Sequence, residues 1–175
     1  MSSVDAPTVA VIMGVSGSGK TTVGKGLARR LGWDFQEGDD LHPAANIAKM
    51  SAGTPLTDED RWPWLRIIAG KIAAWRQNGM EGIVTCSSLR RSYRDVLRAG
   101  HDDVLFVYLK GSRALLLDRM QHRTRHFMPA SLLDTQLATL EEPGADEAAV
   151  TIEMGPPPDE VVTNVLKALA ARDAA

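Results

Sequence analysis

The sequence has little cysteine, almost no net charge and no long apolar run, and each of these absences excludes a class of protein. Cys86 is the only cysteine among 175 residues, so the chain can form neither an internal disulfide nor a cysteine-rich metal site. The formal net charge of −2 provides no overall basic field for binding nucleic acid. No apolar run approaches the ~18 residues that a membrane-spanning helix needs.

The N-terminus also lacks the basic segment and apolar core of a signal peptide, so we expect a cytoplasmic protein. We expect neither a nucleic acid nor a membrane as a partner. The sequence contains no internal repeat and no low-complexity tract. The length and the 44% of hydrophobic residues suit one globular domain, which we expect to comprise residues 1–175.

The segment 14–21 matches G-x-x-x-x-G-K-[ST], the phosphate-binding P-loop. An apolar, β-branched run over 8–13 precedes it and predicts a buried strand, and residues 20–31 have apolar positions at helical spacing. The order strand, glycine loop and helix favours a true P-loop over a chance glycine turn. We therefore expect a nucleotide phosphate, bound by Gly14, Ser16, Gly17, Ser18, Gly19, Lys20, Thr21 and Thr22.

Two P-loop side chains have a predicted chemical role. Lys20 places a cation near the β- and γ-phosphates, where it would act in catalysis, and Thr21 offers a hydroxyl to Mg²⁺. The glycines lack a Cβ, so the backbone can turn its N–H groups toward phosphate at the N-terminus of a helix. The sequence therefore predicts a bound nucleotide phosphate together with Mg²⁺.

The rest of the chain alternates between predicted strands and helices. Such alternation indicates a parallel sheet covered by helices on both faces, with ligands at the carboxyl ends of the strands. Three segments follow strands in this way: 14–21, 37–42 and 86–91. The further strands are expected at 33–35, 82–86, 104–109 and 150–152, and the further helices at 44–52, 57–78, 90–99, from 112 through 120, and after 156–158.

Features outside the P-loop favour a small-molecule kinase. The guanine-reading pattern Asn-Lys-x-Asp is absent, and the chain is short for a motor or transport ATPase. Asp39 could accept a proton from an acceptor hydroxyl, or could simply shape the turn beside Gly38. Arg119 and Arg123 belong to a basic segment that could form a mobile lid over about residues 119–130, or a solvated helix face.

Several motifs taken together resemble the gluconate kinase family. The resemblance spans about residues 9–147, and any one motif alone is weak. It implies ATP-dependent phosphorylation of D-gluconate at the 6-hydroxyl, giving 6-phospho-D-gluconate and ADP, and often a homodimer. The motifs lie at residues 13–20, 38–43, 46–50, 55–65, 86–89, 93–95, 108–111, 126–127, 135–136 and 140–141.

The resemblance also implies a fold. This is the P-loop NTPase fold in its shikimate-kinase-like and nucleoside-monophosphate-kinase-like form. It is a three-layer α/β/α arrangement around a parallel five-stranded sheet of order 2-3-1-4-5.

The resemblance assigns roles to individual residues as well. Asp39 becomes the catalytic carboxylate of the acceptor site and Arg61 a contact of the sugar acid. Gluconate is a monoanion with five hydroxyls, so further polar residues of suitable type are added as substrate contacts. The expected substrate-binding residues are Asp39, His42, Arg61, Ser87, Ser88, Arg94, His126 and Gln136, with Arg119 and Arg123 as catalytic lid residues.

Other interpretations of these residues remain open. Arg61 could pair with Asp58 or Glu59 on a helix surface, His42 could serve only the entry to a helix, and Arg94 could belong to a solvated basic face. The family often carries Asp-x-Asp where this chain has Glu37-Gly38-Asp39. Because the side chain of Glu37 is longer than that of aspartate, we assign only Thr21 to the metal. The alternative functions are phosphorylation of another small hydroxy acid, such as shikimate, and nucleotide binding without catalysis.

Overall fold

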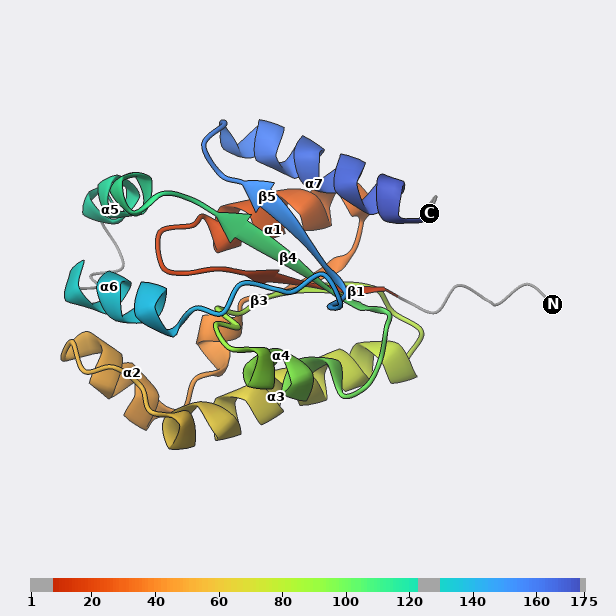
Figure 1. Ribbon diagram of the computed structural model, residues 1–175. Coiled ribbons are helices and arrows are strands. Elements are labelled where there is room, and N and C mark those ends of the chain that lie inside the picture. Colours follow the sequence, from red (N-terminus) through yellow and green to blue (C-terminus); the bar gives the residue numbers. More distant parts are fainter. Residues whose placement is uncertain (1–7, 123–129, 174–175) are drawn as a thin grey trace.

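A parallel sheet forms the centre of the structure, a computed structural model that describes residues 8–122 and 130–173. Its strands are β1 (Val9–Met13), β2 (Asp34–Gln36), β3 (Gly82–Thr85), β4 (Val104–Lys110) and β5 (Ala149–Glu153). The five strands pair in the order β2-β3-β1-β4-β5, and every pairing is parallel. The predicted sheet and its order are therefore confirmed (Figure 1).

Helices cover both faces of this sheet (Figure 1). On one face lie α1 (Lys20–Leu31) and α7 (Pro158–Asp173), and on the other lie α3 (Asp58–Gln77) and α4 (Arg91–Arg98). Three shorter helices gather near the carboxyl ends of the strands: α2 (Ala44–Ser51), α5 (Arg113–Gln121) and α6 (Ala130–Thr139). No described helix has the combination of length and hydropathy that crossing a membrane requires.

The side chains of the central strand β1 explain why helices cover both faces of the sheet. All of its residues are buried, and successive side chains point to opposite faces. Val9, Val11 and Met13 join the core under α3 and α4, whereas Ala10 and Ile12 join the core under α1 and α7. A continuous apolar run thus supplies both cores, as the sequence predicts for a strand of a covered parallel sheet.

Local signals explain the beginning of α3. The Thr57 hydroxyl accepts a hydrogen bond from the Asp60 backbone N–H at 3.2 Å, and the Asp60 carboxylate accepts one from the Thr57 N–H at 2.9 Å. This reciprocal capping satisfies two backbone donors at the helix start. Lys49 of α2 pairs with the same carboxylate at 2.8 Å, so Asp60 also joins α2 to α3.

The helix α6 has no counterpart among the predicted elements, and the predicted turn beside Gly38 forms a 3-10 helix. The 3-10 turn η1 (Gly38–Leu41) carries Asp39, and α6 carries Gln136. Because η1 follows β2 directly, it places Asp39 at the same edge of the sheet as the P-loop.

Candidate active site

The P-loop backbone adopts conformations that favour glycine. Gly14, Gly17 and Gly19 have φ values of 146°, 84° and 85°. A Cβ on Gly17 would lie 2.8 Å from the carbonyl oxygen of Leu116, so the loop also packs too closely there for a side chain. Gly19 is the N-cap of α1 and provides no side-chain cap, and the first turn of α1 contains no acidic residue. The positive end of the helix dipole is therefore available to an anion.

Polar side chains of the P-loop contact the loop itself and α6. Lys20 Nζ donates to the carbonyl oxygens of Gly14 at 2.9 Å and Val15 at 3.1 Å. Gln136 Oε1 accepts from the Ser16 backbone N–H at 2.8 Å, and Gln136 Nε2 donates to Ser16 Oγ at 3.1 Å. Ser18 Oγ is buried and has no hydrogen-bond partner among the described residues, as expected of a loop shaped for a polar ligand.

Glu37 lies at the point where β2, β3 and α1 meet. Its carboxylate accepts a hydrogen bond from Thr21 Oγ1 at 2.6 Å and another from Thr85 Oγ1. Carboxylate and hydroxyl oxygens are hard donors, and Mg²⁺ in phosphate sites uses one or two such groups together with water and phosphate. Thr21 and Glu37 therefore fit a magnesium site, although the described residues contain no cluster of three or more acidic, histidine or cysteine ligands.

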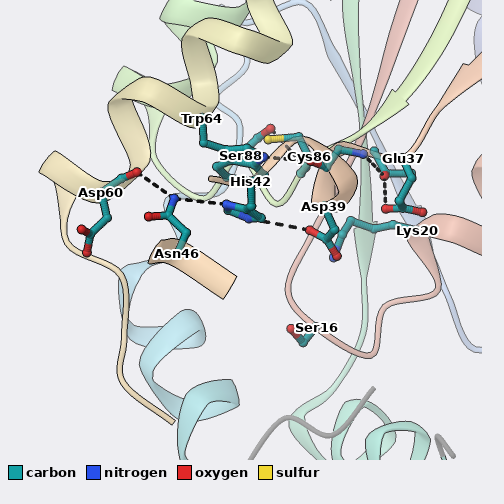
Figure 2. Close-up of polar contacts among 12 residues, drawn as sticks. Ser16, Lys20, Glu37, Asp39, His42, Asn46, Asp60, Trp64, Cys86 and Ser88 are labelled. Carbon is teal, nitrogen blue, oxygen red and sulfur yellow. Dashed lines mark hydrogen bonds and ion pairs between the residues drawn. The ribbon is translucent and has the colours of Figure 1, made fainter. Parts of the chain in front are cut away.

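Gly38 separates the two acidic residues of this segment. A Cβ at this position would overlap the carbonyl oxygen of Thr85, so only glycine fits between β2 and β3 here. The Gly38 N–H donates to Thr85 Oγ1 at 3.0 Å, and its carbonyl oxygen accepts from Trp64 Nε1 at 2.8 Å. These contacts fix the backbone between Glu37 and Asp39, and the two carboxylates have different surroundings (Figure 2).

One cavity beside the P-loop is lined by many of the predicted site residues. It includes residues from the phosphate loop, η1, α3, the segment after β3, and α6. The side chain of Asp39 is 69% exposed, so a ligand in the cavity can reach its carboxylate. The predicted residues that line this cavity are Ser16, Lys20, Asp39, His42, Arg61, Ser87 and Gln136.

His42 is a buried, neutral member of this cavity. Its ring stacks on Trp64, with 3.9 Å between the ring centroids and 16° between the planes. Burial is the main cause that lowers the pKa of His42 to about 4; the charge of Asp39 opposes this shift and that of Arg61 adds to it. At neutral pH His42 therefore offers hydrogen bonds without a charge.

Arg61 is held by a tyrosine rather than by a close carboxylate. Its Nη1 donates to the Tyr93 hydroxyl at 2.8 Å, and the guanidinium carbon lies 5.3 Å from the centre of the Tyr93 ring. The Tyr93 hydroxyl in turn donates to Asp58, whose carboxylate lies 4.0 Å from Arg61. The predicted alternative pairing with Asp58 is thus present only at long range, and Arg61 lines the cavity.

The position of Arg94 corrects a prediction. Its side chain is 1% exposed, pairs with Glu147 at 2.7 Å and donates to the carbonyl oxygen of Ser88 at 2.8 Å. These partners use the guanidinium inside the core, away from the cavity, so we assign Arg94 a structural role instead of substrate binding or a solvated face. Ser88 is also buried, with φ 52°, and donates to the Cys86 carbonyl oxygen, whereas Ser87 lines the cavity.

The predicted lid is described only in part. Arg119 lies on α5, and its Nη2 donates to the carbonyl oxygen of Met154 at 2.8 Å. Arg123 and His126 lie outside the described residues. Thr22, the last predicted P-loop contact, is exposed in the first turn of α1.

Sequence reasoning missed one buried residue of the site and undervalued another. Asn46, on α2, is 3% exposed and contacts His42, but only its place in the motif at 46–50 drew attention to it. Glu37 was discounted because of its longer side chain, yet its carboxylate meets Thr21 directly. A carboxylate directly after the second strand of a P-loop fold was the signal available in the sequence.

Comparisons with known proteins show the family and the fold of the chain. The family model of shikimate kinase matches residues 16–170. A gluconokinase of Gluconobacter oxydans is 50% identical over 167 residues, which cover 95% of this chain and 94% of that protein. The crystal structure of a gluconokinase from Sinorhizobium meliloti has a TM-score of 0.87 at 49% identity, covering 95% of this chain and 93% of the other. Shikimate kinase from Aquifex aeolicus, at 17% identity, shares the fold, with a TM-score of 0.61 and coverage of 96% and 99%.

Proposed function

The chain belongs to the gluconokinase family, and from this premise we propose that it transfers the γ-phosphoryl group of ATP to the 6-hydroxyl of D-gluconate. The products are 6-phospho-D-gluconate and ADP. One observation carries the proposal: Lys20 of the phosphate loop lines the same cavity as Asp39 and Arg61. Donor and acceptor groups can therefore meet in one place.

The donor side is formed by the P-loop and α1. The triphosphate would bind at the N-terminus of α1, and Lys20 would turn from the carbonyl oxygens of Gly14 and Val15 toward the β- and γ-phosphates. Thr21 and Glu37 are the residues that would hold Mg²⁺. When bound there, Mg²⁺ would offset the negative charge of the phosphates.

The acceptor side recognises a sugar acid through one cation and several neutral groups. Arg61 would bind the carboxylate of gluconate, and His42, Ser87 and Gln136 would bind its hydroxyls. Asp39 would orient the 6-hydroxyl and accept its proton as the oxygen forms a bond to the γ-phosphorus. The bond from that phosphorus to the β–γ bridging oxygen breaks, and ADP leaves.

The remaining assignments rest on the family resemblance and on residue chemistry. We propose that Arg119 and Arg123 offset charge on the transferring phosphoryl group, with His126 beside them at the acceptor. We also propose that residues 1–175 work as one domain, in a homodimer, in the cytoplasm.

An ADP-release assay with a panel of acceptors tests the function. We expect ADP release with Mg²⁺, ATP and D-gluconate to exceed the rate without acceptor by several orders of magnitude, and to exceed the rate with shikimate or other aldonates. Equal rates with and without gluconate would reject catalysis and favour a nucleotide-binding protein. Faster turnover of shikimate would reject only the choice of substrate.

A further inference from the structure

The buried amide of Asn46 determines which nitrogen of His42 can carry the ring proton. Asn46 Nδ2 donates to the backbone carbonyl oxygen of Asp60 at 2.9 Å, which fixes the orientation of the amide because a carbonyl can only accept. The same nitrogen lies 3.2 Å from His42 Nδ1, and its second hydrogen serves that contact. Nδ1 must then be the acceptor, and the proton of the neutral ring resides on Nε2.

The opposite edge of the ring faces the proposed catalytic carboxylate. His42 Nε2 lies 3.9 Å from Asp39 Oδ1 (Figure 2). Stacking on Trp64 and a side-chain exposure of only 3% leave the ring little freedom to turn. In the other tautomer a lone pair on Nε2 would face the carboxylate oxygen, and the two would repel each other.

We propose that Asn46 is a positioning residue of the proposed phosphoryl-transfer site, holding His42 as the Nε2–H tautomer so that this N–H restrains the Asp39 carboxylate. The inference rests on the proposed function. A neutral donor has a chemical advantage over a cation at this position. At 3.9 Å the contact is longer than a hydrogen bond, so the N–H acts on the carboxylate as a dipole, without the full positive charge that would weaken the carboxylate as a proton acceptor.

The tautomer can be measured without any assay of activity. The chain has four histidines, so long-range ¹H–¹⁵N correlation spectra of the imidazole rings are simple, and the variant His42→Gln assigns the His42 signals. We expect the wild type at pH 7 to show a proton on Nε2 of His42 and none on Nδ1. In Asn46→Asp the new carboxylate can only accept, so we expect a proton on Nδ1.

Kinetics then test whether the tautomer matters to catalysis. We expect Asn46→Asp and Asn46→Ala each to lower kcat on the order of tenfold, the low end of losses seen when a histidine loses its orienting partner. In the His42→Gln background, Asn46→Ala should cause no further loss. Asn78→Asp adds the same charge at an exposed position after α3 and is the matched control.

Each outcome has a defined meaning. A proton on Nδ1 of His42 in the wild type would overturn the inference, and so would variants that keep the wild-type kcat. An equal loss from Asn46→Ala with and without His42 would show that Asn46 serves only the fold. If the wild type does not turn over gluconate at all, the proposed function fails, and the spectra alone decide on the contact between Asn46 and His42.

Discussion

At the scale of single residues, two neighbouring carboxylates have different partners and therefore suit different tasks. Glu37 accepts hydrogen bonds from Thr21 and Thr85, at the phosphate side of the site. Asp39 is exposed to the cavity. Within the described part of the chain, the nearest basic side chain given for its carboxylate is that of His42, at 3.9 Å, and this ring is neutral at pH 7. Gly38, which tolerates no side chain, keeps the two apart.

The first prediction concerns the base. We expect Asp39→Asn to lower kcat by roughly 10²-fold or more, because the amide keeps the size of the side chain but cannot take the hydroxyl proton. Steady-state kinetics with gluconate measure the loss, and nucleotide binding should be nearly unchanged. If kcat persists while nucleotide affinity falls, Asp39 belongs to the metal site, and Glu37 and Asp40 become the candidates for the base.

The second prediction concerns recognition of the substrate charge. Tyr93→Phe keeps the ring beside Arg61 but removes the hydroxyl that accepts its hydrogen bond. We expect the KM for gluconate to rise roughly tenfold, the value of one hydrogen bond to a charged group, with a smaller change in kcat. D-glucitol has no carboxylate, so its inhibition constant should not change. Equal weakening of both ligands would indicate general damage to the cavity.

At the scale of elements, local patterns predicted most helices and strands, and the family resemblance predicted the strand order, but no individual long-range side-chain pair was predicted. The P-loop, β1 and α1 are adjacent in the chain, and their glycine, β-branched and helical patterns sufficed. The partner of Arg94 is Glu147, 53 residues away, and no pattern in the sequence announces such a pair. The helix α6 was not predicted, and it has no acidic residue in its first turn to mark where it begins.

The third prediction concerns this buried ion pair, which joins α4 to the segment before β5. Arg94→Leu should lower the free energy of unfolding by about 3–5 kcal/mol, since it leaves Glu147 buried without its partner. Arg91→Leu on the same helix breaks an exposed pair with Asp146 and should cost less than about 1 kcal/mol. Denaturant unfolding measures both. A loss for Arg94→Leu no larger than that of the control would show that the pair contributes little.

The ion pair between Arg94 and Glu147 also makes the stability of the fold depend on pH, and the direction of this dependence can be derived. The hydrogen bonds from Arg94 hold the pKa of Glu147 below its ordinary value of 4.5. A lowered pKa in the folded state stabilises the fold above the unfolded value, and the contribution disappears as the pH falls through the folded value. In the wild type, the contribution of Glu147 to stability should therefore be full at pH 7 and be lost as the pH falls below about 4.5, as denaturant unfolding at several pH values would measure.

At the scale of the whole molecule, the sheet brings all the proposed groups to one edge. The donor side depends on β1 and α1, and the acceptor side depends on η1, α3 and the segment after β3. The parallel strands end at a common edge (Figure 1), and segments far apart in the sequence therefore line one cavity there. A nucleotide bound there contacts the folded protein only, so binding and stability are linked.

The fourth prediction follows from this linkage. At an ATP concentration one hundred times the Kd, with Mg²⁺, the folded state gains about 2.7 kcal/mol. For a chain of this size we expect Tm to rise by roughly 5–10 °C in a thermal unfolding scan. Lys20→Ala should lose most of this rise, whereas Lys25→Ala on the exposed face of α1 should retain it. An undiminished rise in Lys20→Ala would place the phosphates elsewhere.

Cys86, the only cysteine of the chain, directly follows β3, and its rate of chemical labelling can report local opening of the wild-type protein. Cys86 is 1% exposed, its backbone N–H is bonded to Ile12 of β1, and burial raises the pKa of its thiol to about 11. A disulfide reagent that needs the thiolate can therefore react only with molecules in which this edge of the sheet has transiently separated. We expect labelling in the native protein to be far slower than in denaturant, and slower again with gluconate present, because the ligand holds the neighbouring Ser87 segment closed. The ratio of the labelling rate without gluconate to the rate with gluconate would measure how much the substrate suppresses opening at this end of β3. The measurement needs no engineered probe.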